Sequence, residues 1–372
     1  MRFPEFSGEW EEHTLSEYLE FKNGLNPDAK RIGSGLPFIS VMDILSEGVI
    51  NYDNIRGKVN ATEKEIECFG VKDGDLLFQR SSETLEDVGR ANVYMDNRTA
   101  IYGGFVIRGR KIGNYDPLFF KYLLATPLAR KRTCRMGAGA QHFNIGQEGL
   151  SKISLYFPSI EEQRKIAEFL SLIDERIATQ NKIIEKLQSL IKGIAQHCIK
   201  ESTSGNTYVK LGDICQITTG KLDANAQVDN GIYPFFTCAE QPFKIDSFAF
   251  DTEALLISGN GANLGYINYY KGKFNAYQRT YVLDLFSENI QYIKWALKVL
   301  LPKRIAIEKS SSNTPYIVLS TLTDLRLPIP CKSKQSFIAN LMQSLERKLS
   351  NQIAQYDSYN YLKQYLLRQM FI

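Results

Sequence analysis

Residues 166–198 read IAEFLSLIDERIATQNKIIEKLQSLIKGIAQHC, and this stretch decides the fold. Mainly apolar residues recur at alternating spacings of four and three over five heptads and fill two seams: Ile166, Ile173, Gln180, Leu187 and Ile194 in one, and Leu170, Ile177, Ile184, Ile191 and Cys198 in the other. A repeat of 3.5 residues is typical of a helix that packs along another helix. About 38 residues span roughly 55 Å at ~1.5 Å per residue, which predicts a long spacer helix.

The C-terminal residues carry the same pattern. Its two seams are Ile338, Leu345, Gln352, Tyr359 and Leu366, and Met342, Leu349, Tyr356, Lys363 and Met370. Buried stripes of equal length predict two antiparallel helices, near 160–200 and 332–372. Gln180 and Gln352 are polar residues near the two midpoints, so we expect them to meet and set the helix register. Two alternatives stay open: each helix packs separately on its own domain, or each glutamine points toward solvent or a partner helix.

An internal repeat organises the rest of the chain. LSEYLEFKNG at 15–24 is similar to LGDICQITTG at 211–220, and DLLFQR at 75–80 is similar to ALLISG at 254–259. From Asp116 to the C-terminus the halves match at a constant offset of 172 residues, with Pro158 on Pro330 and Gln163 on Gln335. The first half is about two dozen residues longer within its strand-rich part. We therefore expect two similar modules, each followed by a long helix.

Short runs rich in Val, Ile, Tyr and Phe predict the strands of each module. They are 36–41, 92–95, 104–109 and 153–158 in the first half, and 265–270, 279–286 and 325–330 in the second. A short basic helix is expected near 117–132 and again near 289–304. The fold class is therefore α+β, with two mixed α/β domains separated by two long antiparallel coiled-coil helices. The expected boundaries are 1–158, 159–204, 205–330 and 331–372.

Composition favours a protein that folds and binds nucleic acid. Apolar residues make up 44% of the 372 residues, and the net charge is +4. Residues 108–135 contain eight Lys or Arg residues and one acidic residue. Such a basic segment is suited to binding phosphate groups, although a solvated helix face is the alternative. The N-terminus lacks a secretion signal, and no run of 18 apolar residues occurs, so we expect a cytoplasmic location without a membrane partner. Six scattered cysteines without a CxxC pair indicate neither zinc nor disulfides.

The sequence offers no active site or cofactor loop. His13, His142 and His197 stand apart from other metal ligands, and no P-loop or NPPY-type methyltransferase motif occurs. The glycine-rich run 259–265 has GxGxxxG spacing and lies between expected strands, which is wrong for a dinucleotide site. We therefore expect no enzyme activity, no metal site and no cofactor in this chain.

Polar loops beside the basic helices are the places where we expect contacts with a nucleic acid. Phosphates are bound by Lys and Arg, and base edges by Arg, Asn, Gln or Ser. The candidates are Arg80, Ser81, Arg90, Lys131, Arg132, Arg135, Gln141, His142 and Asn144 in the first half, and Ser258, Asn260, Asn263, Tyr277, Arg279, Lys303, Arg304, Ser312, Asn313 and Tyr316 in the second. An ordinary exposed turn or a strand-end salt bridge is the alternative for each.

Two motifs resemble the specificity subunit of type I restriction-modification systems. Residues 2–24, RFPEFSGEWEEHTLSEYLEFKNG, resemble the usual start of that family. Residues 145–177, IGQEGLSKISLYFPSIEEQRKIAEFLSLIDERI, resemble its most recognisable stretch, a proline followed by Glu-Gln and a long helix. The second repeat keeps Gln335 but has Lys334 where the first has Glu162. The resemblance covers essentially the whole chain.

The resemblance implies a non-catalytic reader of a two-part DNA site. Each of two target-recognition domains would read one half-site of double-stranded DNA, and the antiparallel helices would act as a ruler between them. The implied partners are methyltransferase subunits and restriction (motor-nuclease) subunits. S-adenosylmethionine, ATP and Mg²⁺ would bind those partners. The recognised bases and the gap length do not follow from the sequence.

Three other classes compete with this interpretation. One is the recognition subunit of a related system that cuts on both sides of its site, which gene neighbours would distinguish. The second is a self-sufficient nuclease or methyltransferase, which would modify DNA without a partner. The third is a purely structural coiled-coil protein, which the basic helices in both halves disfavour.

Overall fold

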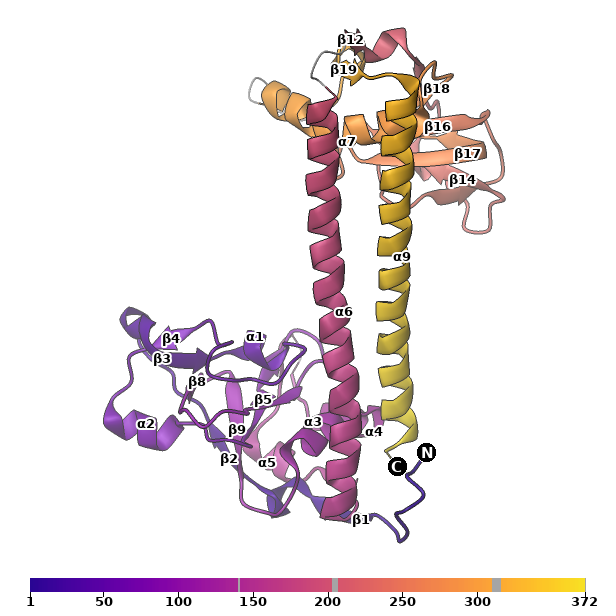
Figure 1. Cartoon of the computed structure of the whole chain (residues 1–372). Coiled ribbons are helices and arrows are strands. Elements are labelled where there is room, and N and C mark those ends of the chain that lie inside the picture. The colour runs from indigo at the N-terminus through magenta and orange to yellow at the C-terminus, as the bar shows by residue number, and fades with distance from the viewer. Residues whose placement is uncertain (140, 203–206, 310–315, 372) are drawn as a thin grey trace. The chain divides into compact units, whose positions relative to one another are not determined.

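The computed structural model describes residues 1–139, 141–202, 207–309 and 316–371, and these form two compact units. Unit 1 contains Met1–Asn181 together with the chain from Ala354 onward, and unit 2 contains Lys182–Ile353. Two long helices, α6 (Ile160–Glu201) and α9 (Lys332–Gln369), each contribute residues to both units (Figure 1). The heptad pattern therefore correctly predicts both long helices.

Unit 1 combines small sheets with short helices. A four-stranded antiparallel sheet has the order β2 (Leu19–Asn23), β9 (Val106–Lys111), β5 (Leu76–Gln79), β7 (Ala91–Val93). Beside it lie the three-stranded sheet β4 (Lys58–Val59), β3 (Ile32–Ile39), β8 (Ile101–Tyr102) and the two ribbons β1 (Glu11–Thr14) with β11 (Ser154–Phe157) and β6 (Ser81–Ser82) with β10 (Phe143–Asn144). The helices are α1 (Val41–Ile44), α2 (Glu63–Phe69), α3 (Pro117–Ala125), α4 (Pro127–Arg135) and α5 (Gln147–Ser151).

Unit 2 is built around one larger sheet. Its order is β13 (Gln216–Thr219), β18 (Thr280–Asp284), β16 (Phe250–Ser258), β17 (Ile267–Ala276), β14 (Tyr233–Phe236), β15 (Phe243–Ile245). A ribbon pairs β12 (Thr207–Lys210) with β19 (Arg326–Ile329), and the helices besides the long pair are α7 (Ile290–Lys309) and α8 (Leu319–Thr323).

The strand pairings of the two units match. In unit 1, β3 pairs parallel with β8 and antiparallel with β4; in unit 2, β14 pairs parallel with β17 and antiparallel with β15. The extra length of the first half lies between β3 and β5, from residue 40 to 75, whereas only residues 237–249 separate β14 from β16. This insertion carries α1 and α2. The predicted pair of similar mixed α/β domains is confirmed.

The predicted constant offset of 172 residues is wrong for one helix. Gln163 accepts a hydrogen bond from the backbone N–H of Asp116 (3.1 Å), and Gln335 accepts the equivalent bond from that of Asn289 (3.0 Å). The donors Asp116 and Asn289 are therefore equivalent, and their offset is 173. In unit 1 the helix breaks at Thr126, whose hydroxyl accepts a bond from the backbone of Ala129 and caps α4. Pro127 follows at the first helical position. The break separates α3 from α4, whereas α7 is one continuous helix.

The long helices run antiparallel within each unit. In unit 1 Asp174 of α6 pairs with Lys363 near the end of α9, with Nζ and Oδ1 2.5 Å apart. In unit 2 Lys334 at the start of α9 donates to the carbonyl of Glu201 at the end of α6 (3.1 Å). Most seam residues of α6 are buried, including Leu170 and Ile191. The predicted antiparallel pair is confirmed.

The difference between Glu162 and Lys334 in the two repeats has a structural reason. Glu162 is 1% exposed and accepts two hydrogen bonds from Arg2, from Nε (2.7 Å) and from Nη2 (2.6 Å). Lys334 instead meets the C-terminal carbonyl of a helix, which favours a cation. Each repeat therefore carries the charge that its own surroundings favour.

Candidate nucleic-acid interface

The chain after β5 is held by backbone hydrogen bonds to three other segments of unit 1. Gln79 donates its backbone N–H to the carbonyl of Arg90 (2.8 Å), and Arg80 donates to that of Phe105 (2.9 Å). The carbonyl of Arg80 accepts from the N–H of Ile145 (3.0 Å). We call these five residues junction 1. It lies beside two groups of sequence candidates, Arg80 and Ser81 in one segment and Gln141, His142 and Asn144 in the other.

Unit 2 contains the same arrangement after β16. Ser258 donates its N–H to Tyr266 (3.0 Å), Gly259 donates to Arg279 (2.8 Å), and the carbonyl of Gly259 accepts from Ile317 (2.8 Å). We call these residues junction 2. Each bond has its counterpart in junction 1, so the two units expose different side chains on one backbone frame.

A glycine with positive φ closes each junction. Gly89 (φ 66°) donates its N–H to the carbonyl of Gln79 (2.9 Å), and Gly265 (φ 82°) donates to that of Ser258 (2.8 Å). Residues with a Cβ rarely adopt this backbone conformation. The backbone conformation of the two junctions therefore favours glycine at positions 89 and 265.

The ribbon of β6 and β10 extends junction 1. Ser81 is paired with Asn144, and its hydroxyl donates to the side-chain oxygen of Asn144. Asn144 donates its amide to the carbonyl of His142 (3.2 Å). Gln141, His142 and Asn144 are exposed, and Ser81 is half-buried. The structure therefore brings four candidates from the two loops into one polar edge.

Some side chains beside junction 2 form hydrogen bonds within the protein. The Cys238 thiol donates to Oδ1 of Asn260 (3.0 Å), and Nδ2 of Asn263 donates to the carbonyl of Cys238 (3.1 Å). Tyr277 is half-buried, and Ser258 is only 2% exposed, so its hydroxyl is not at the surface. Arg279 is exposed and Tyr316 is 53% exposed. Ser312 and Asn313 lie outside the described residues.

The basic helix α4 uses some of its cations to brace the fold. Arg130 donates Nη2 to the carbonyls of Glu86 (2.8 Å) and Val88 (2.6 Å) and so fastens the loop before Arg90. Arg132 pairs with Glu12 (2.7 Å) and also donates to the backbone of Ser154. A DNA-backbone role for Arg132 competes with these bonds and stays a prediction.

Other predicted cations are more exposed. Lys131, Arg135 and Lys303 are exposed. Arg304 forms an ion pair with Glu308 one turn along α7 (2.7 Å). Arg90 pairs with Asp87 (2.6 Å), with its side chain 53% exposed. Lys131, Arg135 and Lys303 are thus well placed to meet an external anion.

The sequence analysis missed two side chains of the junctions. Phe105 is 68% exposed at the position that Arg279 occupies in unit 2, and Tyr266 is 38% exposed at the position of Arg90. Phe105 follows two glycines, Gly103 and Gly104, which is a turn signal that could have marked it. Only the matched hydrogen bonds reveal the correspondence.

A lysine at a matched position of each unit lies near an acid of a long helix. Burial lowers the pKa of Lys121 to about 8, and the nearby Asp174 opposes that shift. In unit 2 Lys294 pairs with Glu346 of α9 (2.7 Å). Asp174 and Glu346 are related by the offset of 172, and Lys121 and Lys294 by that of 173. Lys294 is ion-paired with its acid, whereas Nζ of Lys121 donates to the backbone carbonyl of Glu47 (3.3 Å), so the two contacts differ.

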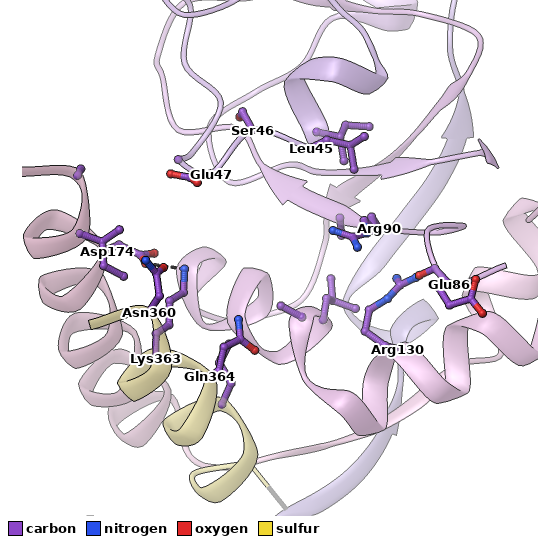
Figure 2. A pocket seen from close by; sticks show the side chains of 18 of the residues that line it. Leu45, Ser46, Glu47, Glu86, Arg90, Arg130, Asp174, Asn360, Lys363 and Gln364 are labelled. Carbon is purple, nitrogen blue, oxygen red and sulfur yellow. Dashed lines mark hydrogen bonds and ion pairs between the residues drawn. The ribbon is translucent and has the colours of Figure 1, made fainter. Parts of the chain in front are cut away.

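A cavity of about 670 Å³ adjoins Asp174 in unit 1. Figure 2 shows Asp174, Lys363 and Gln364 from the long helices on one side and Arg90 and Arg130 on the other. Both signs of charge line it, so the lining selects neither an anion nor a cation.

Groups suited to metal binding or catalysis do not gather in the described part of the chain. Among these residues no three His, Cys, Asp or Glu side chains form a metal-binding group, and the six cysteines are free. His13 lies 2.7 Å from Glu17, which raises the pKa of the imidazole. No helix in the described ranges combines the length and apolarity that a membrane span needs.

The fold and the paired junctions define a duplicated α+β protein with two long antiparallel helices. A family model described as the type I restriction modification DNA specificity domain matches residues 7–189 and 203–356. The chain belongs to this family.

Individual relatives agree with this assignment. The chain is 44% identical over 137 residues to the EcoDI specificity subunit of Escherichia coli, a match that covers 37% of this chain and 30% of that protein. It is 22% identical over 394 residues to the MjaIX specificity subunit of Methanocaldococcus jannaschii, covering 92% and 88%. The chain thus spans less than a third of the first relative but most of the second.

Solved structures share the fold. The crystal structure of a type I restriction-modification S subunit from M. genitalium matches with a TM-score of 0.66 and 18% identity, over 98% of this chain and 96% of that one. A second solved chain, from a study of complex assembly and conformational transition of the type I R-M system, matches with a TM-score of 0.60 and 16% identity over 97% of each chain. These matches support the α+β architecture.

Proposed function

We propose that this chain is the DNA-binding specificity subunit of a type I restriction-modification complex and acts in the cytoplasm, where its DNA target lies. One domain, 1–158, reads one half-site of double-stranded DNA, and the other, 205–330, reads the second. The helical segments 159–204 and 331–372 hold the two readers at a fixed separation and position methyltransferase and restriction subunits. The match of one family model to both halves carries the proposal.

The junctions supply the surfaces for this activity. Each unit gathers polar and cationic side chains from separate loops at the end of one buried strand, and an exposed lysine lies on the helix nearby, Lys131 or Lys303. Lysines suit phosphates, and the loop side chains suit base edges. The chain itself is proposed to be non-catalytic, with S-adenosylmethionine, ATP and Mg²⁺ bound by its partners.

The test uses the chain produced with its methyltransferase subunit in a host whose DNA lacks the modification. Sequencing of methylated adenines should reveal one interrupted motif, which disappears when the gene for this chain is omitted. Methylation that is unchanged without the chain would overturn the proposal. Methylation of DNA by the purified chain with S-adenosylmethionine alone would instead identify a self-sufficient enzyme.

A further inference from the structure

The two units place very different side chains at one matched backbone position. Phe105, immediately before β9, accepts a hydrogen bond from the N–H of Arg80 through its carbonyl, and Arg279, immediately before β18, accepts one from the N–H of Gly259 in the same way. The Phe105 ring is 68% exposed. The Arg279 side chain is exposed and forms no hydrogen bond or ion pair among the described residues.

The frame holds the backbone of this position and leaves its side chain to solvent. Strand neighbours fix it from one side: Val106 pairs with Gln79, and Thr280 pairs with Ser258. Ile145 and Ile317 in turn donate to the carbonyls of Arg80 and Gly259, the residues that bond to Phe105 and Arg279. A rigid backbone removes the cost of ordering the loop when a ligand binds, so only the side chain itself has to be ordered.

A single exposed aromatic residue on a protein surface is ordinary. Phe105 differs by its surroundings, because it lies beside the polar ribbon of Ser81 and Asn144 and one residue from Gly104, whose carbonyl accepts Nη1 of Arg80 (3.4 Å). Ile112, at the opposite end of β9, is 60% exposed but lies far from this junction along the strand. Ile112 is therefore a matched control.

We propose that Phe105 and Arg279 are specificity-determining side chains, each contacting a base edge in the half-site that its own unit reads. The inference rests on the proposed function. An arginine can donate two hydrogen bonds to O6 and N7 of guanine, and an apolar ring can contact the methyl group of thymine. Unit 2 therefore selects a guanine through Arg279, and unit 1 selects a thymine through Phe105, so the two half-sites differ at this matched position.

The experiment selects DNA from a pool with both half-sites randomised, using the chain in complex with its methyltransferase subunit. Phe105→Ala should lose about fivefold to hundredfold discrimination at one position of one half-site, and Arg279→Ala should do so at a guanine of the other. Ile112→Ala and Arg326→Ala, two exposed residues outside the junctions, should leave both half-sites unchanged. Phe105→Arg should acquire a preference for guanine at the affected position, a gain that misfolding cannot imitate.

Three outcomes would overturn the inference. They are wild-type preference at every position in Phe105→Ala, equal weakening on all sequences, and loss of discrimination in both half-sites at once. A wild-type complex without any sequence preference would instead overturn the proposed function, so the two failures are distinguishable.

Discussion

Asp174 on α6 and Lys363 on α9 form an ion pair 2.5 Å long, and the hydroxyl of Tyr122 on α3 donates to the same carboxylate (2.8 Å). One carboxylate thus joins both long helices to the short helix of unit 1. Both charged side chains are less than a quarter exposed. Partial burial makes such a contact costly to break, because the remaining partner keeps an unsatisfied charge.

We expect Asp174→Asn to lower the unfolding free energy of unit 1 by about 1–3 kcal/mol. The control is Glu5→Gln, which breaks a pair between Glu5 and Lys165 with both side chains almost half exposed. That change should cost less than about 1 kcal/mol. Denaturant unfolding measures both, and equal effects would show that the Asp174 contact adds nothing beyond a surface ion pair.

Gly89→Ala should destabilise junction 1. A Cβ there would lie 2.4 Å from Cγ2 of Thr133, and φ is 66°. We expect a loss of about 1–3 kcal/mol from strain and crowding. Gly48→Ala meets no atom within 4 Å at an ordinary φ and serves as the control. Thermal unfolding compares them, and an equally stable Gly89→Ala protein would contradict the closed geometry of the junction.

Lys121 should make stability depend on pH in the alkaline range. Burial lowers its folded pKa to about 8, from a usual value of 10.5. Between these two values the unfolded chain binds more protons, so the contribution of Lys121 to the unfolding free energy rises with pH. Lys121→Met should reduce that rise between pH 8 and 10.5, whereas Lys131→Met at an exposed site should not. Parallel pH profiles for wild type and Lys121→Met would refute the shift.

Lys131→Ala and Lys303→Ala should weaken DNA binding about equally for all sequences. Each removes one proposed phosphate contact, and the slope of log affinity against log salt should become shallower by about one unit. Titrations with specific and unrelated DNA at several salt concentrations measure this. A change in the preferred bases would show that these lysines read sequence instead.

The helical segments should determine the gap between half-sites. Gln180 is buried in unit 1 and Gln352 lies in unit 2, so their predicted pairing stays a prediction. Inserting four residues beside Gln180 adds ~6 Å of helix. The preferred gap should lengthen by one or two base pairs at ~3.4 Å each, with the half-site sequences retained. New half-site sequences at the old gap, seen in the methylated DNA, would argue against the ruler.

The sequence alone determined the two long helices, the duplication and the strand-rich modules. These features follow from local periodicity and from residues such as Pro158 and Gln163, which recur in the second half of the chain. It also marked the loops around Arg80 and Asn144, because polar turn residues beside basic helices are locally visible. The tertiary structure decided which loops meet: Ser81 pairs with Asn144 across 63 residues. It also assigned Arg132 to Glu12, and matched Phe105 with Arg279 through backbone bonds that no side-chain pattern encodes. Contacts between distant segments depend on how sheets and helices pack around a shared core. A local sequence pattern does not specify that packing.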